Sequence, residues 1–149
     1  ERGRRAGTEN VAGIVGAAAA FAEALGEREH KAARLAQMRD EIQAGLLKIP
    51  EAVVNGANAA RLPGTLNMSF SGVDGQSLIF ALDSNGIAAS SGSACASGSI
   101  SPSHVLLALG LPYSLAHGSL RISLGRYNTS GEVNTVIQTV TRVITEMRA

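Results

Sequence analysis

The chain has 149 residues, of which 45% are apolar, and this size and composition suit one globular domain or part of one. Aromatic residues make up 3% and tryptophan is absent, which argues against a base-stacking surface for nucleic acid, and the net charge of +1 predicts no polyanionic partner. The single cysteine excludes an internal disulfide and is typical of a reducing compartment, so we expect a cytoplasmic protein.

The pattern of apolar residues predicts no membrane segment. The longest apolar run, residues 11–25, is interrupted by Gly13, Gly16 and Glu23 and is too short to span a bilayer. No signal-peptide pattern is present. The chain begins with Glu1 instead of Met, so we expect it to be part of a longer protein.

The first ten residues are polar and basic, and they lead into a helix. Thr8 or Asn10 is a suitable cap for the first turn, because its side chain can accept a free backbone N–H group. Two interpretations remain open. The segment is either an anion site at a helix N-terminus or a chain end with solvated charges.

Residues 11–47 are predicted to be helical, because alanine is abundant and apolar residues recur at spacings of three and four. Gly26 divides this run and predicts a break or a kink. A solvated outer face without a functional role is expected for the charged residues Arg28, Lys31, Arg34 and Glu41. Pro50 ends the helical run.

The period then changes to that of β-structure. Strands are predicted at residues 52–54, 66–71 and 87–89, with a helix at residues 77–82 between the last two. A further helix is expected to begin at Pro102, with Ser101 as its cap, and to close at Gly110.

The last third of the chain contains a strand and a long helix. Residues 120–124 alternate, so Leu120, Ile122 and Leu124 should face the core, and Arg121 and Ser123 the other side. The final helix begins near Ser130, and we predict that its apolar stripe is core: Val133, Val136, Ile137, Val140, Val143, Ile144 and Met147. The expected fold is an α/β (α+β) small domain whose short sheet is packed on one side by helices.

Residues 90–103 are rich in serine and contain Cys95. Such a run favours an exposed and mobile loop, whereas structural cysteines are usually buried among apolar neighbours. Two interpretations stay open here as well. Cys95 is either a thiol on a tether, which reacts in one place and unloads in another, or an incidental residue of a linker.

Arg121 is the best candidate to pair with such a thiol, because a guanidinium binds a carboxylate through two parallel hydrogen bonds. The alternative is an exposed strand residue without a ligand. The three histidines do not have metal-ligand spacing and one cysteine is too few for a structural zinc site, so no metal is expected. A thiol-protease pair is disfavoured, because its nucleophile must stay aligned with an oxyanion hole.

Three motifs carry a resemblance to a known family. They are ERGRRAGTEN at residues 1–10, SSGSAC at residues 90–95 and AHGSLRISLGR at residues 116–126. In order and spacing they resemble the C-terminal part of the cysteine desulfurases, the NifS/IscS-like branch of the class V, fold-type I pyridoxal-phosphate enzymes. The resemblance covers essentially the whole chain.

The resemblance implies that L-cysteine is converted to L-alanine with pyridoxal 5'-phosphate as cofactor. Cys95 would be the catalytic nucleophile that takes up the sulfur as a persulfide, Arg121 would bind the substrate carboxylate, and Thr8 would reach across a homodimer to the cofactor phosphate. The sulfur would pass to acceptor or scaffold proteins for iron-sulfur cluster or thio-cofactor assembly.

The chain departs from the family in one respect. Its two lysines, Lys31 and Lys48, are not in the context of the cofactor lysine, which the resemblance places before Glu1. We therefore expect residues 1–50 to link to an absent large cofactor domain, residues 51–149 to form the C-terminal small domain with the cysteine loop, and the chain alone to be inactive. Alternatives are another class V aminotransferase, a selenocysteine lyase, or a standalone sulfur-carrier or interaction module.

Overall fold

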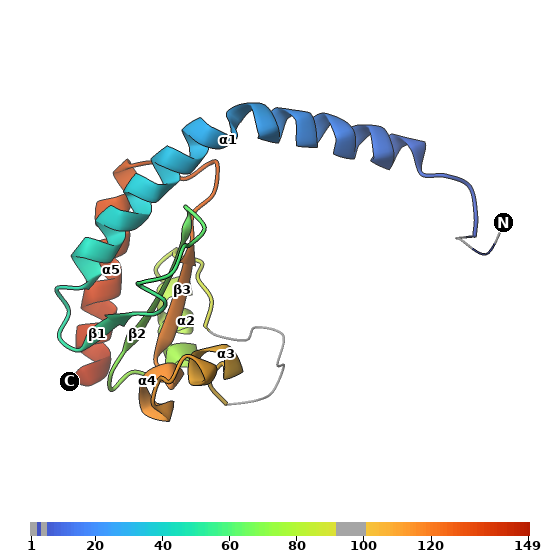
Figure 1. The fold of residues 1–149 in the computed structure, drawn as a ribbon. Coiled ribbons are helices and arrows are strands. Elements are labelled where there is room, and N and C mark those ends of the chain that lie inside the picture. Colours follow the sequence, from blue (N-terminus) through green and yellow to red (C-terminus); the bar gives the residue numbers. More distant parts are fainter. Residues whose placement is uncertain (1–2, 4–5, 92–100) are drawn as a thin grey trace.

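The structure, a computed structural model, describes residue 3, residues 6–91 and residues 101–149. Figure 1 shows a long helix that leads into a body of strands and shorter helices. The elements run in the order α1 (Val11–Leu46), β1 (Ala52–Val54), β2 (Thr65–Phe70), α2 (Gly75–Asp83), α3 (His104–Ala108), α4 (Tyr113–His117), β3 (Ser119–Ser123) and α5 (Gly131–Arg148). Cys95, and most of the serine-rich loop that was predicted around it, lie outside the described residues.

The strands form one antiparallel sheet in the order β1-β2-β3. β2 is the central strand, and its Asn67 is the direct cross-strand partner of Arg121 on β3. The strand predicted at residues 87–89 is wrong. Instead, Ser90 alone forms a bridge with Arg121, because the chain runs beside β3 at this one position before it enters the serine-rich loop.

The core lies between one face of the sheet and helices α1, α2 and α5. β2 and β3 contribute Leu66, Met68 and Phe70 and then Leu120 and Ile122, all buried as the alternation predicts. The mixed α/β fold with helices on a short sheet is therefore confirmed.

The apolar stripe of α5 is confirmed as core. Val133, Val140, Val143 and Ile144 are buried, and the other members of the stripe pack partly buried against the same cluster. α1 approaches α5 closely at Gly45, where any added side chain would collide with Ile137. Glycine at this position therefore sets how tightly the two helices pack.

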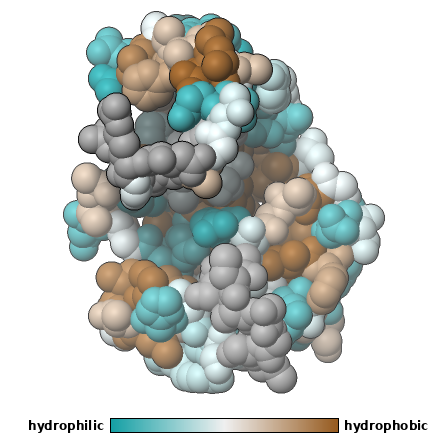
Figure 2. Space-filling model, turned by 90° about the vertical axis from the view of Figure 1, so that its right-hand side faces the viewer, coloured by the Kyte–Doolittle hydropathy of each residue, from teal (hydrophilic) through white to brown (hydrophobic). Residues whose placement is uncertain are grey.

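α1 continues through Gly26, so of the two predicted alternatives the break is wrong, whereas Figure 1 shows that α1 changes direction along its length. One glycine costs a helix interior about 1 kcal/mol, and the alanine-rich flanks tolerate this cost. The first half of α1 projects away from the body (Figure 1). It leaves Val11, Ile14, Phe21 and Leu25 more than half exposed. Figure 2 looks from the side towards which α1 projects and shows hydrophobic surface at the top.

One predicted helix start, one helix that was missed and one surface residue need correction. α3 begins at His104 with Ser103 as N-cap, two residues later than predicted, and the short helix α4 was not predicted at all. Arg34 does not lie on a purely solvated face, because its guanidinium is partly buried against the loop between β3 and α5. At the N-terminus of α1, the cap is Asn10 and not Thr8, since Asn10 Oδ1 accepts a hydrogen bond from the Gly13 N–H at 3.0 Å.

Candidate active site

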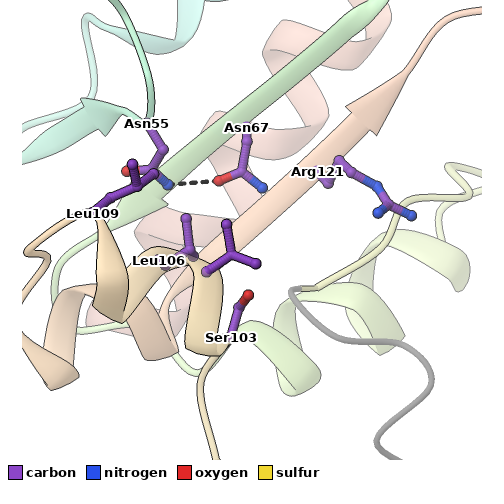
Figure 3. A pocket seen from close by; sticks show the side chains of 7 residues that line it. Asn55, Asn67, Ser103, Leu106, Leu109 and Arg121 are labelled. Atoms are coloured by element: carbon purple, nitrogen blue, oxygen red, sulfur yellow. Dashed lines mark hydrogen bonds between the residues drawn. The ribbon is translucent and has the colours of Figure 1, made fainter.

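A pocket of about 330 Å³ lies on the sheet face that points away from the core, where α3 covers part of the sheet. Figure 3 shows Asn67 and Arg121 on the strands, Asn55 just after β1, and Leu106, Leu109 and Ser103 in or beside α3. The lining residues are Asn55, Asn67, Ser103, Val105, Leu106, Leu109 and Arg121. Among the described lining residues, the amides and Arg121 come from the strand side, the leucines and valine from the α3 side, and Arg121 is the one cation.

Arg121 is the charged group of this pocket. The alternation of β3 places its side chain opposite Leu120 and Ile122, as predicted, and the side chain is exposed. None of the residues that the structure describes forms a hydrogen bond or ion pair with its guanidinium. An unpaired guanidinium in a concave site is suited to bind a carboxylate or another planar anion.

Both ends of the cysteine loop border this pocket. At one end, the backbone N–H of Ser90 donates to the Arg121 carbonyl oxygen at 3.1 Å, and the Arg121 N–H donates to the Ser90 oxygen at 2.6 Å. At the other end, Ser103 is buried and lines the pocket. Ser90 and Ser103, which flank the segment with Cys95 in the sequence, therefore both lie at the site of Arg121, and Cys95 itself is outside the described residues.

Thr8 lies elsewhere. It precedes the N-terminus of α1, which Figure 1 shows far from the sheet, so the chain does not bring Thr8 and Arg121 together within one molecule. Thr8 is exposed at the beginning of a 36-residue helix. A helix N-terminus favours a negatively charged group.

The strand side of the pocket contains an amide pair that the sequence did not reveal. Asn55 follows β1 and is only 6% exposed. Its Nδ2 donates to Asn67 Oδ1 at 2.6 Å and to Ser69 Oγ at 2.8 Å, and the first of these bonds is drawn in Figure 3. No local signal could have identified the pair, because Asn55-Gly56 also fits an ordinary turn.

A second polar cluster joins α2 to α4. His117 Nδ1 lies 3.2 Å from Asp74 Oδ2, and the rings of His117 and Tyr113 stack. Asp74 is the N-cap of α2 and accepts from the Ser77 hydroxyl at 2.6 Å and the Ser77 N–H at 2.7 Å. These hydrogen bonds, chiefly that from the hydroxyl, together with the charge of His117 lower the pKa of Asp74.

The part of the chain that the structure describes lacks two further features. It contains no group of three or more His, Cys, Asp or Glu side chains that could hold a metal ion. None of its helices is long and apolar enough to cross a bilayer.

The structure combines a short antiparallel sheet packed by helices with an arginine in a pocket that Ser103 also lines. The family model for aminotransferase class-V matches residues 1–136, and the chain belongs to this family. Among its relatives, the cysteine desulfurase NifS of Azotobacter vinelandii is 46% identical over 149 residues. The cysteine desulfurase IscS of Methanosarcina thermophila is 48% identical over 148 residues. The resemblance to the NifS/IscS branch is therefore confirmed.

Solved structures agree with this assignment. A NifS-like protein superposes with a TM-score of 0.84 at 34% identity, over 97% of this chain and 36% of the other. A NifS-like protein from Rickettsia africae has a TM-score of 0.81 at 29% identity, over 93% of this chain and 36% of the other. The two curated relatives each match 99% of this chain, which spans 37% of their length.

Proposed function

We propose that this chain is the C-terminal part of a cysteine desulfurase, which uses pyridoxal 5'-phosphate to convert L-cysteine to L-alanine and keeps the sulfur as a persulfide on Cys95. The observation that carries this proposal is the guanidinium of Arg121, which has no partner among the described residues and lies in a pocket beside Ser90 and Ser103. The relatives named cysteine desulfurase over 99% of the chain support it.

Arg121 binds the carboxylate of the substrate. Its backbone N–H and carbonyl groups both bond to Ser90, and the rest of β3 pairs with β2, so the strand fixes the position from which the side chain extends. The guanidinium meets the substrate without first breaking an ion pair to another described residue. Such a charge-assisted contact orients the amino acid as well as holding it.

Cys95 takes up the sulfur. Its thiolate attacks the sulfur of the substrate, so a sulfur–sulfur bond forms while the bond from sulfur to the substrate carbon breaks. The electron pair of the broken bond stays with the carbon skeleton, which takes up a proton and leaves as alanine. Because no basic residue flanks Cys95 in the sequence, the site that the loop enters must favour the thiolate.

Pyridoxal phosphate, when bound, supplies the electron sink for this reaction. The described residues fit one part of the cofactor, its phosphate, because Thr8 presents a hydroxyl at the N-terminus of α1. The described residues offer no lysine for the aldehyde group of the cofactor, since Lys31 is paired with Glu27 and Lys48 is exposed just after α1. The distance between Thr8 and the Arg121 pocket supports a homodimer in which Thr8 serves the partner's site.

We extend the proposal to the organisation of the complete protein. Residues 1–50 link to a large cofactor domain, which covers the exposed apolar side of α1, and residues 51–149 form the small domain. The protein is cytoplasmic, and it delivers sulfur to an acceptor or scaffold protein for iron-sulfur cluster or thio-cofactor assembly. Another class V aminotransferase, a selenocysteine lyase and a sulfur-carrier module are the alternatives that an assay must exclude.

The test uses the complete protein that contains this segment. With L-cysteine we expect alanine and sulfide in the presence of a thiol reductant. Cys95→Ser should lose persulfide formation while the absorbance of the bound cofactor persists, because a hydroxyl is a poor acceptor of sulfane sulfur. Sulfur transfer that survives in Cys95→Ser would remove Cys95 from the reaction, and cofactor-independent sulfur binding would favour the carrier module.

A further inference from the structure

Asn67 and Arg121 are direct cross-strand partners, and both side chains line the same pocket. Antiparallel partners alternate between hydrogen-bonded pairs and non-hydrogen-bonded pairs, and in the latter the Cα atoms are about 4.5 Å apart. The backbone of Arg121 bonds to Ser90, and the carbonyl oxygen of Asn67 accepts from the Asn55 N–H at 2.9 Å. Both backbones thus turn their hydrogen-bonding groups away from each other, so Asn67 and Arg121 are a non-hydrogen-bonded pair facing one pocket.

Asn55 sets the orientation of the Asn67 amide. Asn55 Nδ2 donates to Asn67 Oδ1 at 2.6 Å, which engages the oxygen of Asn67 and leaves its Nδ2 for the pocket. Figure 3 shows the Asn67 oxygen on the side of Asn55 and the nitrogen on the side of Arg121. Because Asn55 is buried and also held by Ser69, the amide of Asn67 has a fixed partner behind it.

From this arrangement we infer that Asn67 is a second binding residue for the substrate carboxylate, which it contacts through Nδ2–H beside the guanidinium of Arg121, and that Asn55 is the positioning residue that turns this donor toward the pocket. The inference rests on the proposed function for the identity of the substrate. A carboxylate has two oxygens with several acceptor sites, so it can accept from the guanidinium and from an amide N–H together.

The inference depends on the orientation of the Asn67 amide. If this amide were rotated by 180°, its oxygen and not its Nδ2 would point into the pocket. That arrangement suits a bond from Arg121 and repels a carboxylate. Asn55 Oδ1 is buried with no hydrogen-bond partner among the described residues, which is the consequence of using both Nδ2 protons toward Asn67 and Ser69. A substitution that makes residue 55 an acceptor should therefore rotate the Asn67 amide, so that Asn67 Nδ2 donates to residue 55 and Asn67 Oδ1 faces the pocket.

The variants follow from this geometry. Asn67→Ala removes the donor, and Asn55→Asp leaves Asn67 in place but offers it an acceptor, so Asn67 turns its oxygen to the pocket. Ser123→Ala is the matched control, because Ser123 is exposed on the same face of β3 and does not line the pocket. Thermal unfolding of each variant shows that the fold is retained.

Steady-state assays on the complete holoenzyme give the first readout. Loss of one hydrogen bond to a charged group weakens binding by about 10-fold to 100-fold, so Asn67→Ala should raise KM for L-cysteine by that factor with kcat changed less than about 3-fold. Asn55→Asp should raise KM about 10-fold although Asn67 is present. Ser123→Ala should leave both constants within about 2-fold.

Binding gives the second readout and separates this inference from the proposed function. Calorimetric titration with L-alanine should show the same weakening in Asn67→Ala, whereas cysteamine, which lacks a carboxylate, should inhibit wild type and variant equally. If wild type releases alanine but KM and L-alanine binding are unchanged in Asn67→Ala, the inference is overturned and the function stands. If wild type releases no alanine, the function fails, and the L-alanine titration decides the inference: weakening supports it, and no change or no binding overturns it.

Discussion

Arg34 Nη1 on α1 donates a 2.6 Å hydrogen bond to the carbonyl oxygen of Asn128, 94 residues later in the chain. Nη2 of the same guanidinium donates to the carbonyl oxygen of Arg126 at 3.1 Å. These two bonds join the long helix to the loop that follows β3. One side chain thus satisfies two backbone acceptors that have no place in a helix or strand.

We predict that Arg34→Met destabilises the chain by about 1.5–3 kcal/mol, the usual contribution of hydrogen bonds to a charged group. Methionine keeps much of the apolar stem but cannot donate. Urea denaturation followed by circular dichroism measures the change. Arg28→Met, on an exposed part of the same helix, should stay within about 0.5 kcal/mol, and equal effects of the two substitutions would contradict the role of Arg34.

Asp74 predicts a dependence of stability on acid pH. Its pKa is lowered first by the Ser77 hydroxyl, then by the Ser77 N–H group and the charge of His117. A carboxyl whose pKa is lower in the folded state stabilises the fold above its unfolded pKa of about 3.9, and this contribution disappears as the pH falls through the lower folded value.

Asp74→Ala should therefore lose about 1 kcal/mol at neutral pH, because the N-cap of α2 is removed. The difference between wild type and Asp74→Ala should shrink as the pH falls from about 5 to about 2. Asp74→Asn, which retains a cap but cannot ionise, is the control. Thermal unfolding at a series of pH values gives the comparison, and a difference that does not change with pH would refute the prediction.

The parts of the fold that were predicted correctly are those with a clear period. The stripe on α5 and the alternation of Leu120, Arg121 and Ile122 depend only on side-chain direction within one element, so the sequence shows them directly. The break predicted as one alternative at Gly26 does not occur, because a single glycine lowers helix propensity without ending the helix in an alanine-rich segment.

The parts that were missed depend on packing between distant segments. The bond from Asn55 to Asn67 joins residues 12 apart across two strands, and that from Arg34 to Asn128 crosses from a helix to a loop. α4 has only five residues, too few to show a helical period. For the site, the side of the sheet that Arg121 faces could be predicted, whereas the roles of Cys95, Arg121 and Thr8 stay predictions.

The core gives a sharper test of the packing. Ile144 on α5 is completely buried, so Ile144→Ala should destabilise the chain by about 2–5 kcal/mol through lost burial and the cavity left behind. Ile14 makes the matched control, since it is 59% exposed on the projecting half of α1. Ile14→Ala should change stability by less than about 0.5 kcal/mol. If both substitutions lowered the free energy of unfolding by a similar amount, the assignment of Ile144 to the core would be wrong.

The exposed apolar residues on the first half of α1 predict that the 149-residue chain associates when prepared alone, since contiguous apolar surface recruits a neighbour. Phe21 is 67% exposed and Val15 is 62% exposed. Replacing both with glutamate should make sedimentation independent of concentration. If the unsubstituted chain is already monomeric at high concentration, this surface does not self-associate.

The last prediction concerns cofactor binding by the 149-residue chain itself. Thr8 supplies one phosphate contact, and even a charge-assisted contact contributes only about 1.5–3 kcal/mol, less than the cost of about 4–15 kcal/mol for immobilising a ligand. Neither Lys31 nor Lys48 lines the Arg121 pocket. We therefore expect the chain to remain colourless after addition of pyridoxal phosphate and gel filtration, and to release no alanine from cysteine. A protein-bound visible absorbance band that is lost in Lys31→Ala or Lys48→Ala would show that one of these lysines is the cofactor lysine.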